Sequence, residues 1–453
     1  MSENGRIIKC SLRYSLEEPG GSAVTDEEAT VELTAETLSF LPRWGQALLF
    51  SLREIGQVSA ADYRLEMDLA SGERLVLTHL GRQYDDFVRE LAQARNQLMI
   101  RDLLMEERLV RGGFRAEYTR TLQDGRTHSG RCEIRLYETA LVVIPEAEAI
   151  ERVPYSYVTS ARDRDYTLSV EIEEDGTFTF SQLGRKFELL VRSLSGAMND
   201  LTINAQETIR DLIPGIDGLS ARRAARLLKD GRASRRSDLE AACPGLWGRL
   251  EAELEDQGLG EKYAFLKTLT DPDSMSIGIK RGLMGDLTGD YIWFLVPIYD
   301  RDPARPGNAV VMEAVSGEAT GRATYCFRLT PRREYPQLAG DPDLLQSRAD
   351  HFIRRLNRCM LNISFRREPI YLPEERLAQP RYARYRVAAQ ILPELRLLRR
   401  HFIGRVIYSS LQQWQQNLME LLKFNVSVED DSLQWRGRDE PGDPEPSEGG
   451  SRI

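Results

Sequence analysis

LGRQYDDFVRELAQARNQL, at Leu80–Leu98, returns as LGRKFELLVRSLSGAMNDL at Leu183–Leu201. The second stretch aligns with the first without a gap when 103 is added to each residue number, and nine of the nineteen positions are identical. The same offset continues upstream, where VELTAETLSFLP from Val31 aligns with IRLYETALVVIP from Ile134. One offset that holds over some seventy residues indicates a duplicated structural unit.

Each copy carries a strand-rich part followed by one long helix. Alternating β-branched or aromatic segments, separated by turn residues, predict antiparallel strands in the first copy at Val31–Leu33, Leu38–Leu41, Ala47–Leu52, Tyr63–Leu69 and Arg74–Thr78. The segment that follows predicts an amphipathic helix, because Tyr84, Phe87, Val88, Leu91, Ala94 and Leu98 keep the spacing of one apolar stripe. We expect this helix to run through Leu104 and to stop at Gly112 and Gly113.

Several antiparallel strands closed by one C-terminal helix resemble the pleckstrin-homology-like domains, over roughly residues 5–205. The resemblance implies two tandem antiparallel β-barrels, residues 1–110 and 111–210. Lipid-binding members of that family hold phosphoinositide head groups with a basic loop between their first two strands. The corresponding segment of the first copy, residues 17–28, carries five carboxylates that would repel a phosphate, while the second copy offers only Arg126, His128 and Arg131. The resemblance therefore favours docking of proteins or peptides and argues against membrane lipid.

Residues 211–270 predict a small helical module, because their apolar residues fall at helical spacing and Ser220 could cap the first helix. PGIDGLSARRAARLL, from Pro214, resembles the helix-hairpin-helix family over roughly residues 212–254. In that family a Gly-hydrophobic-Gly turn presents backbone N–H groups to a DNA phosphate. The turn here is one residue longer, and Asp217 puts a negative charge where the phosphate would lie.

A basic set surrounds this turn and is the candidate nucleic-acid site of the chain. The alternative is that these side chains form a solvated face of a packing module or pair with the many carboxylates of the protein. The set comprises Arg222, Arg223, Arg226, Lys229, Arg232, Arg235 and Arg236.

Residues 271–375 predict an α+β domain. YIWFLVPIYD from Tyr291, NAVVMEAV from Asn308 and ATYCFRLT from Ala323 predict three strands, the first apolar enough to be buried on both faces. A helix is predicted over Asp341–Ile363, and this order of elements leaves open a third, diverged pleckstrin-homology-like unit. Residues 376–426 predict two helices separated at Pro393, which pack on the protein itself or form a homodimer interface. Residues 427–453, acidic and rich in Pro, Gly and Ser, predict a disordered tail.

Composition and motifs predict a cytoplasmic, multidomain α+β protein without cofactor or metal. The 453 residues suggest about three domains, and the formal net charge of −9 opposes a general affinity for nucleic acid or anionic membrane. The five cysteines form no CxxC pair, which predicts reduced thiols, and no apolar run reaches the length of a membrane span. His79, His128, His351 and His401 are isolated, and the common catalytic fingerprints are absent from the sequence. We therefore expect no enzyme activity.

PRWG, at Pro42–Gly45, predicts a tight turn with Trp44 at its tip, where the second copy has Ala147. Such a Trp either folds back as a lid on its own barrel or is an interaction hot spot, so Trp44 is the candidate protein-binding residue. These patterns together predict a non-catalytic adaptor or scaffold that binds a protein partner. The alternatives are a nucleic-acid-associated protein that contacts phosphates through the basic set, and an enzyme whose site is assembled from distant residues.

Overall fold

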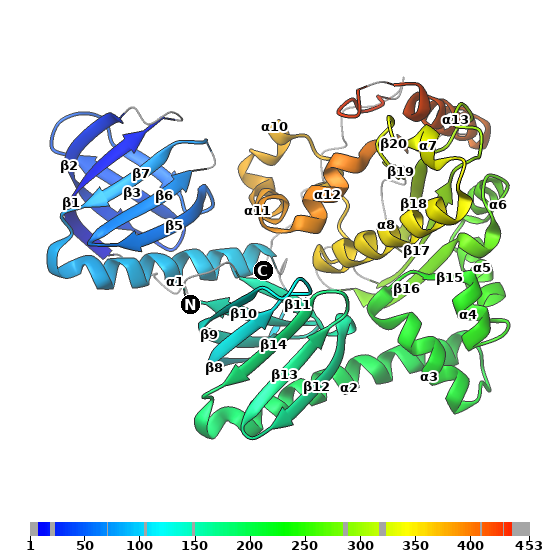
Figure 1. Ribbon diagram of the computed structural model, residues 1–453, viewed down its shortest axis with the longest axis horizontal. Coiled ribbons are helices and arrows are strands. Elements are labelled where there is room, and N and C mark those ends of the chain that lie inside the picture. The colour runs from blue at the N-terminus through cyan, green and yellow to red at the C-terminus, as the bar shows by residue number, and fades with distance from the viewer. Residues whose placement is uncertain are drawn as a thin grey trace, which may run out of the picture.

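The computed structural model describes residues 8–18, 23–69, 71–103, 107–146, 150–283, 289–316, 323–407, 410–428 and 430–436. These residues form a mixed α+β structure in which three antiparallel sheets follow one another along the chain (Figure 1). The first sheet lies at one end of the molecule, and helix α1 leads from it to the second sheet. The helices of the middle and C-terminal parts surround the third sheet.

The first sheet has seven strands in the order β4-β3-β2-β1-β7-β6-β5. Helix α1, Tyr84–Leu103, closes it, because the stripe predicted from the sequence places Tyr84, Phe87, Leu91 and Leu98 in one apolar core with the inward residues of the strands. A 3-10 turn, Gly81–Gln83, joins the last strand to this helix. The strands are β1 Ile8–Glu17, β2 Ala23–Leu33, β3 Thr37–Pro42, β4 Leu48–Ser51, β5 Ile55–Ala61, β6 Arg64–Leu69 and β7 Arg74–Thr78.

The second sheet repeats this arrangement strand for strand, in the order β11-β10-β9-β8-β14-β13-β12, and helix α2, Phe187–Leu212, closes it. The register is also repeated, since Leu38 pairs with Phe50 and the equivalent Leu141 pairs with Val153. The strands are β8 Leu109–Thr121, β9 Thr127–Tyr137, β10 Ala140–Pro145, β11 Glu151–Pro154, β12 Val158–Arg164, β13 Thr167–Ile172 and β14 Gly176–Ser181, with 3-10 turns at Tyr155–Tyr157 and Gly184–Lys186.

Three expectations for the two copies are wrong in detail. Helix α1 is described to Leu103, and its expected continuation through Leu104 lies outside the described residues, but Gly112 and Gly113 lie inside β8 at a shift of its register with β9 instead of stopping a helix. Gly113 has a φ of +77°, which suits an extra residue bulging from a strand. Much of residues 17–28, expected as a loop, belongs to β2, and two strands, β1 and β5, were not among the predicted ones.

The middle of the chain is helical, as predicted. Its helices are α3 Gly218–Leu227, α4 Arg236–Ala242, α5 Leu246–Asp256 and α6 Gly260–Lys267, with 3-10 turns at Lys229–Gly231 and Pro272–Ser274. They share one apolar core with the end of α2 and with one face of the third sheet. Asp217 caps α3, where Ser220 was expected to do so, since its side chain accepts hydrogen bonds from the backbone N–H groups of Leu219 and Ser220.

The third sheet is a six-stranded meander in sequence order, β15 to β20, and both of its faces are covered. Along β17, Trp293 and Leu295 join the core that includes α8, while Ile292 and Phe294 join the core that includes α13, so the strand is buried on both sides as its continuous apolar run predicts. The described part of this sheet does not repeat the seven-stranded order of the first two. The strands are β15 Ser234–Arg235, β16 Ser276–Leu283, β17 Gly289–Ile298, β18 Ala309–Ser316, β19 Ala323–Arg328 and β20 Phe402–Ile407.

The C-terminal part of the chain differs from the predicted pair of helices. Pro393 begins α12 as expected, but residues 402–407 form strand β20 at the edge of the third sheet instead of continuing the helix. The apolar residues Leu395, Leu398, Trp414 and Leu418 are buried within the chain, so these faces are occupied without a second copy. The helices are α7 Tyr335–Leu338, α8 Pro342–Asn362, α9 Glu368–Tyr371, α10 Glu374–Leu377, α11 Ala383–Ile391, α12 Pro393–His401 and α13 Leu411–Ser427, with a 3-10 turn at Pro380–Tyr382.

The predicted tail falls largely outside the described residues, which end at Arg436. Before that point Asp431 pairs with Arg328, and Trp435 donates its backbone N–H to the carbonyl of Ile403 in β20 over 2.7 Å. All five cysteines are free and buried. None of the described helices has the length and apolar character needed to span a bilayer.

Candidate interaction surfaces

The turn between β3 and β4 presents Trp44 to solvent. The chain reverses there through Gly45, whose φ of +111° is open to glycine and strained for other residues. Trp44 is 80% exposed, so the lid interpretation is wrong: the indole does not fold back on the sheet. A largely solvated indole costs hydrophobic free energy in the isolated chain, and burying it against a partner would recover that free energy.

Two leucines extend the apolar surface from this turn. Leu41 on β3 is 40% exposed and Leu49 on β4 is 67% exposed. Leu49 pairs with Ser39, which lies two residues from Leu41 on the same face of β3, so both leucines lie on the outer face of the hairpin. We refer to Leu41, Trp44 and Leu49 as the β3–β4 face. It lies at the margin of the sheet, because β4 is the outermost strand.

Ion pairs surround the β3–β4 face on the neighbouring strands. Lys9 of β1 binds Glu32 of β2 at 2.6 Å, and Glu32 pairs in register with Ser39 of β3. Arg13 binds Asp26 at 2.7 Å and holds the pKa of that carboxyl below its ordinary value. These pairs balance charges on β1 and β2, Arg43 beside Trp44 in the turn is exposed, and the three residues of the face itself are apolar.

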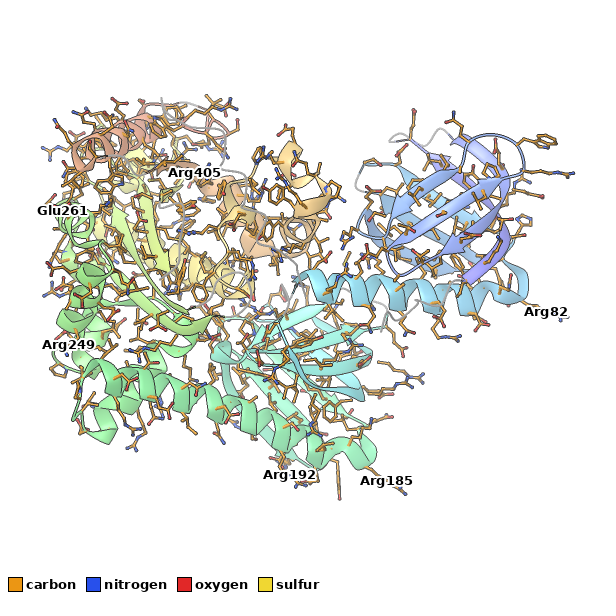
Figure 2. All side chains as sticks on the ribbon, turned by 180° about the vertical axis from the view of Figure 1, so that it is seen from behind. Arg82, Arg185, Arg192, Arg249, Glu261 and Arg405 are labelled. Carbon is orange, nitrogen blue, oxygen red and sulfur yellow. The ribbon has the colours of Figure 1, made fainter. Side chains whose placement is uncertain are left out.

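The opening Leu-Gly-Arg of the repeat is explained only in part by the fold. Leu80 and Leu183 are buried, and Gly81 and Gly184 have left-handed φ values of +54° and +55°. The arginine is not needed for either role: Arg82 and Arg185 point away from the chain at the starts of α1 and α2 (Figure 2). Nothing in the structure explains why both copies have arginine there.

The basic set of residues 222–236 divides into two groups. Arg222, Arg223 and Arg226 lie exposed on α3, opposite the buried Ala221, Ala224 and Ala225, and form no ion pair with a described residue. The others are partly buried. Burial, with help from Arg232 and Arg226, lowers the pKa of Lys229. The seven residues therefore do not form one continuous exposed surface.

Three arginines of the set form ion pairs with carboxylates of the same chain. Arg232 binds Glu173 at 2.8 Å, Arg235 binds Asp350 at 3.0 Å, and Arg236 approaches Asp273 at 3.5 Å. The guanidinium of Arg232 also lies 4.8 Å from the ring centre of Tyr157. The first two contacts attach the middle helices to the second sheet and to α8, and the third lies within the middle part, so these three arginines do pair with carboxylates.

The turn that resembles the helix-hairpin-helix family does not offer its backbone N–H groups to a phosphate. Asp217 accepts hydrogen bonds from the backbone N–H groups of Leu219 and Ser220 at 2.9 and 3.0 Å. Hydrogen bonds from Ser220, and from the backbone of Leu219, lower the pKa of Asp217, so the carboxylate is charged at neutral pH. The donors that a phosphate would need are taken by the protein's own carboxylate.

Features typical of catalysis are sparse in the described part of the chain. No group of three or more His, Cys, Asp and Glu side chains there could hold a metal ion. A hollow of about 340 Å³ near the start of α8 offers one carboxylate and one guanidinium, from Asp300 and Arg301, without a nucleophile beside a base. Glu313 is fully buried, but Thr324 donates a hydrogen bond to it and Trp414 donates to Thr324 at 2.8 Å, so it belongs to the core.

Among known proteins, the chain matches solved structures. No family model matches the chain, and neither does any curated protein. The solution structure of the N-terminal PH domain of human ARAP2 is 14% identical, with 22% of this chain and 86% of that chain covered and a TM-score of 0.18. The structure of the Spt16D Pob3N heterodimer is 11% identical, with 38% of this chain and 85% of that chain covered and a TM-score of 0.17.

Proposed function

We propose that this chain is a non-catalytic adaptor that binds a partner protein on the β3–β4 face. The observation that carries the proposal is the exposure of Leu41, Trp44 and Leu49, from β3, β4 and the turn between them, at the margin of the first sheet. Aromatic residues exposed beside smaller apolar ones are the usual centre of a protein interface. The free, buried cysteines fit a reducing compartment such as the cytoplasm.

The support for this surface is a pair of pleckstrin-homology-like domains in tandem, residues 1–110 and 111–210. The repeated seven-stranded order with one closing helix supports this assignment. Residues 211–270 form the helical module, 271–375 an α+β domain, 376–426 the C-terminal part, and 427–453 the tail. In this arrangement the first domain presents the binding face, and the remainder holds it on a larger framework.

A photo-crosslinking experiment tests the proposal. The photoreactive residue p-benzoylphenylalanine replaces Leu49 in the full chain, and irradiation in the native host is followed by identification of covalent adducts. A discrete adduct with one protein, resistant to nuclease, is the expected result. The same residue placed at Ile203, which is half exposed on α2, is the control. Equal adducts at both positions, or none at position 49, would reject the proposal.

Replacing Trp44 by alanine is expected to leave stability unchanged within about 0.5 kcal/mol, because the side chain is exposed and removes little apolar area from water in the free protein. The same substitution should make the free energy of partner binding less favourable by about 2 kcal/mol or more, roughly a 30-fold loss of affinity, as substitutions of hot-spot residues do. Urea unfolding and titration of the cross-linked partner measure the two effects. A stability loss of about 2–3 kcal/mol would instead show that the indole packs on the sheet.

A second function rests on the three exposed arginines of α3, which present one basic face. Through Arg222, Arg223 and Arg226 the protein would contact the backbone of a nucleic acid. With about three phosphates neutralised, affinity for duplex DNA should fall roughly 40-fold between 50 and 200 mM salt. Substituting all three by Glu should abolish binding, as measured by fluorescence anisotropy. The control substitutes three other exposed arginines and makes the same change in charge: Arg82 in the turn before α1, Arg185 in the turn before α2, and Arg192 on α2 (Figure 2).

Substituting Asp217 by Ser separates this function from the helix-hairpin-helix resemblance. Serine keeps an N-cap acceptor for α3 but removes the negative charge. If the start of α3 faces a phosphate, Asp217→Ser should raise the affinity for duplex DNA several-fold. An unchanged affinity would place the phosphates on the arginine face alone.

A further inference from the structure

The duplication provides an internal comparison for the β3–β4 face. Ser39, Leu41 and Leu49 of the first sheet are equivalent to Val142, Ile144 and Arg152 of the second. The equivalence holds in three dimensions, because Ser39 pairs with Leu49 and Val142 pairs with Arg152 in the same register. Whatever covers the second of these faces is therefore a guide to what fits the first.

Helices of the same chain cover the face of the second sheet. Val142 and Ile144 are 1% and 7% exposed, and they form one apolar cluster with Met99 and Ile100 from the end of α1 and Val387 from α11. Ile391, one helical turn after Val387, packs against this cluster. The covering helix α11 thus offers aliphatic residues four positions apart, which lie on the same side of a helix.

The edge strand of the second sheet also faces a helix. Arg152, the equivalent of Leu49, donates hydrogen bonds to the carbonyl of Leu361 at 3.2 Å and to the side chain of Asn362 at 3.1 Å, both at the end of α8. Leu49 carries no hydrogen-bonding group and is exposed. The first sheet therefore has the same strand order and register as the helix-covered second sheet. It has an apolar leucine at the position where the second sheet makes a polar contact with α8. Its equivalent face is exposed to solvent.

We infer that the β3–β4 face binds an amphipathic helix of a partner protein through aliphatic residues four positions apart, as α11 covers the second sheet. This inference rests on the proposed function and names the class of its partner. Lys9 and Arg13 on the neighbouring strand β1 are held in ion pairs, and the three residues of the face are apolar, so apolar contact would select the partner. Trp44, at the tip of the turn, would lie over the side of the docked helix.

A designed peptide tests the inference on the full chain. The probe is a lactam-bridged helix that carries the side chains of residues 383–391, since an unconstrained segment of this length is not helical in water. Trp44 is the main reporter of binding, because Trp247, Trp293 and Trp414 are buried, Trp435 is partly buried, and acrylamide quenches exposed indoles preferentially; the Trp44→Phe variant supplies the background from Trp435. We expect a saturable blue shift and protection from quenching, and neither in a Trp44→Phe variant.

Matched variants assign the site. Leu49→Asp should lower the affinity of the protein for the peptide at least tenfold. Leu344→Asp, at a partly exposed leucine of α8, should leave that affinity unchanged. A peptide with Asp in place of the residues corresponding to Val387 and Ile391 should not bind. Equal binding by the Leu49→Asp and parent proteins, or no protection of Trp44 by the parent peptide, would overturn the inference.

The crosslinking experiment separates this inference from the proposed function. A partner joined at position 49 through a helical segment supports both. If the adduct maps to an extended segment, the adaptor function stands and the helix is rejected. If the only adduct is a second copy of this chain, and Leu49→Asp abolishes self-association in sedimentation, the partner helix is rejected in favour of a dimer.

Discussion

Replacing Arg152 by methionine is expected to lower the free energy of unfolding by about 3–5 kcal/mol, because it leaves a buried carboxylate without its counterion. The Arg152 and Glu107 side chains are 2% and 6% exposed, and Arg152 Nη2 lies 3.0 Å from Glu107 Oε2. The same nitrogen donates to Thr139 Oγ1 at 3.0 Å. The other end of the guanidinium reaches Leu361 and Asn362, so one side chain joins the second sheet to α8.

The repeat supplies a control for this substitution. Leu49→Met changes the equivalent residue of the first sheet, where the side chain is exposed, and should alter stability by less than about 0.5 kcal/mol. Adding Glu107→Gln to Arg152→Met should restore part of the loss, because the buried charge is then removed. Urea unfolding followed by circular dichroism measures the series. A loss below about 1 kcal/mol, or no recovery in the double variant, would show that the pair is dispensable.

The repeated part of the fold could be predicted because its signals are local. The apolar stripe of α1 and the alternation along β6 are visible in neighbouring residues, and one numerical offset connects the copies. Strand β1 carried the same kind of signal, since Cys10, Leu12 and Tyr14 alternate inward, and it was overlooked. Strand β20 was mistaken for helix because Leu398, Phe402 and Val406 are also spaced four apart. Pairing with β19, a contact distant in sequence, decides the strand.

The candidate surfaces depended on contacts that sequence cannot reveal. Leu41 and its equivalent Ile144 occupy the same position in similar strands, yet one is exposed and the other is buried under helices from elsewhere in the chain. Trp44 was found because a Trp in a turn is conspicuous, whereas Leu49 had no distinguishing local signal. Arg232 and Arg235 looked unpaired because their carboxylate partners lie 59 and 115 residues away.

Replacing Tyr157 by alanine is expected to destabilise the protein by about 3–5 kcal/mol, as truncation of a buried aromatic side chain does. The Tyr157 ring is 5% exposed and lies close to two guanidinium groups, with Arg232 at 4.8 Å and Arg358 at 5.6 Å from its centre. Arg232 also binds Glu173, and Arg358 binds Asp175, in the turn between β13 and β14. Losing the ring leaves a cavity in the core and removes the cation–π contacts of both arginines.

Tyr157→Phe is the matched control, and it should change stability by less than about 1 kcal/mol. The Tyr157 hydroxyl is buried without a hydrogen-bond partner among the described residues, and burial raises its pKa well above the ordinary value. Removing an unsatisfied hydroxyl costs little and can stabilise the protein, while phenylalanine keeps the ring beside both guanidinium groups. Urea unfolding of both variants tests this. If Phe is as damaging as Ala, the hydroxyl, and not the stacked ring, holds the second sheet to Arg232 and Arg358.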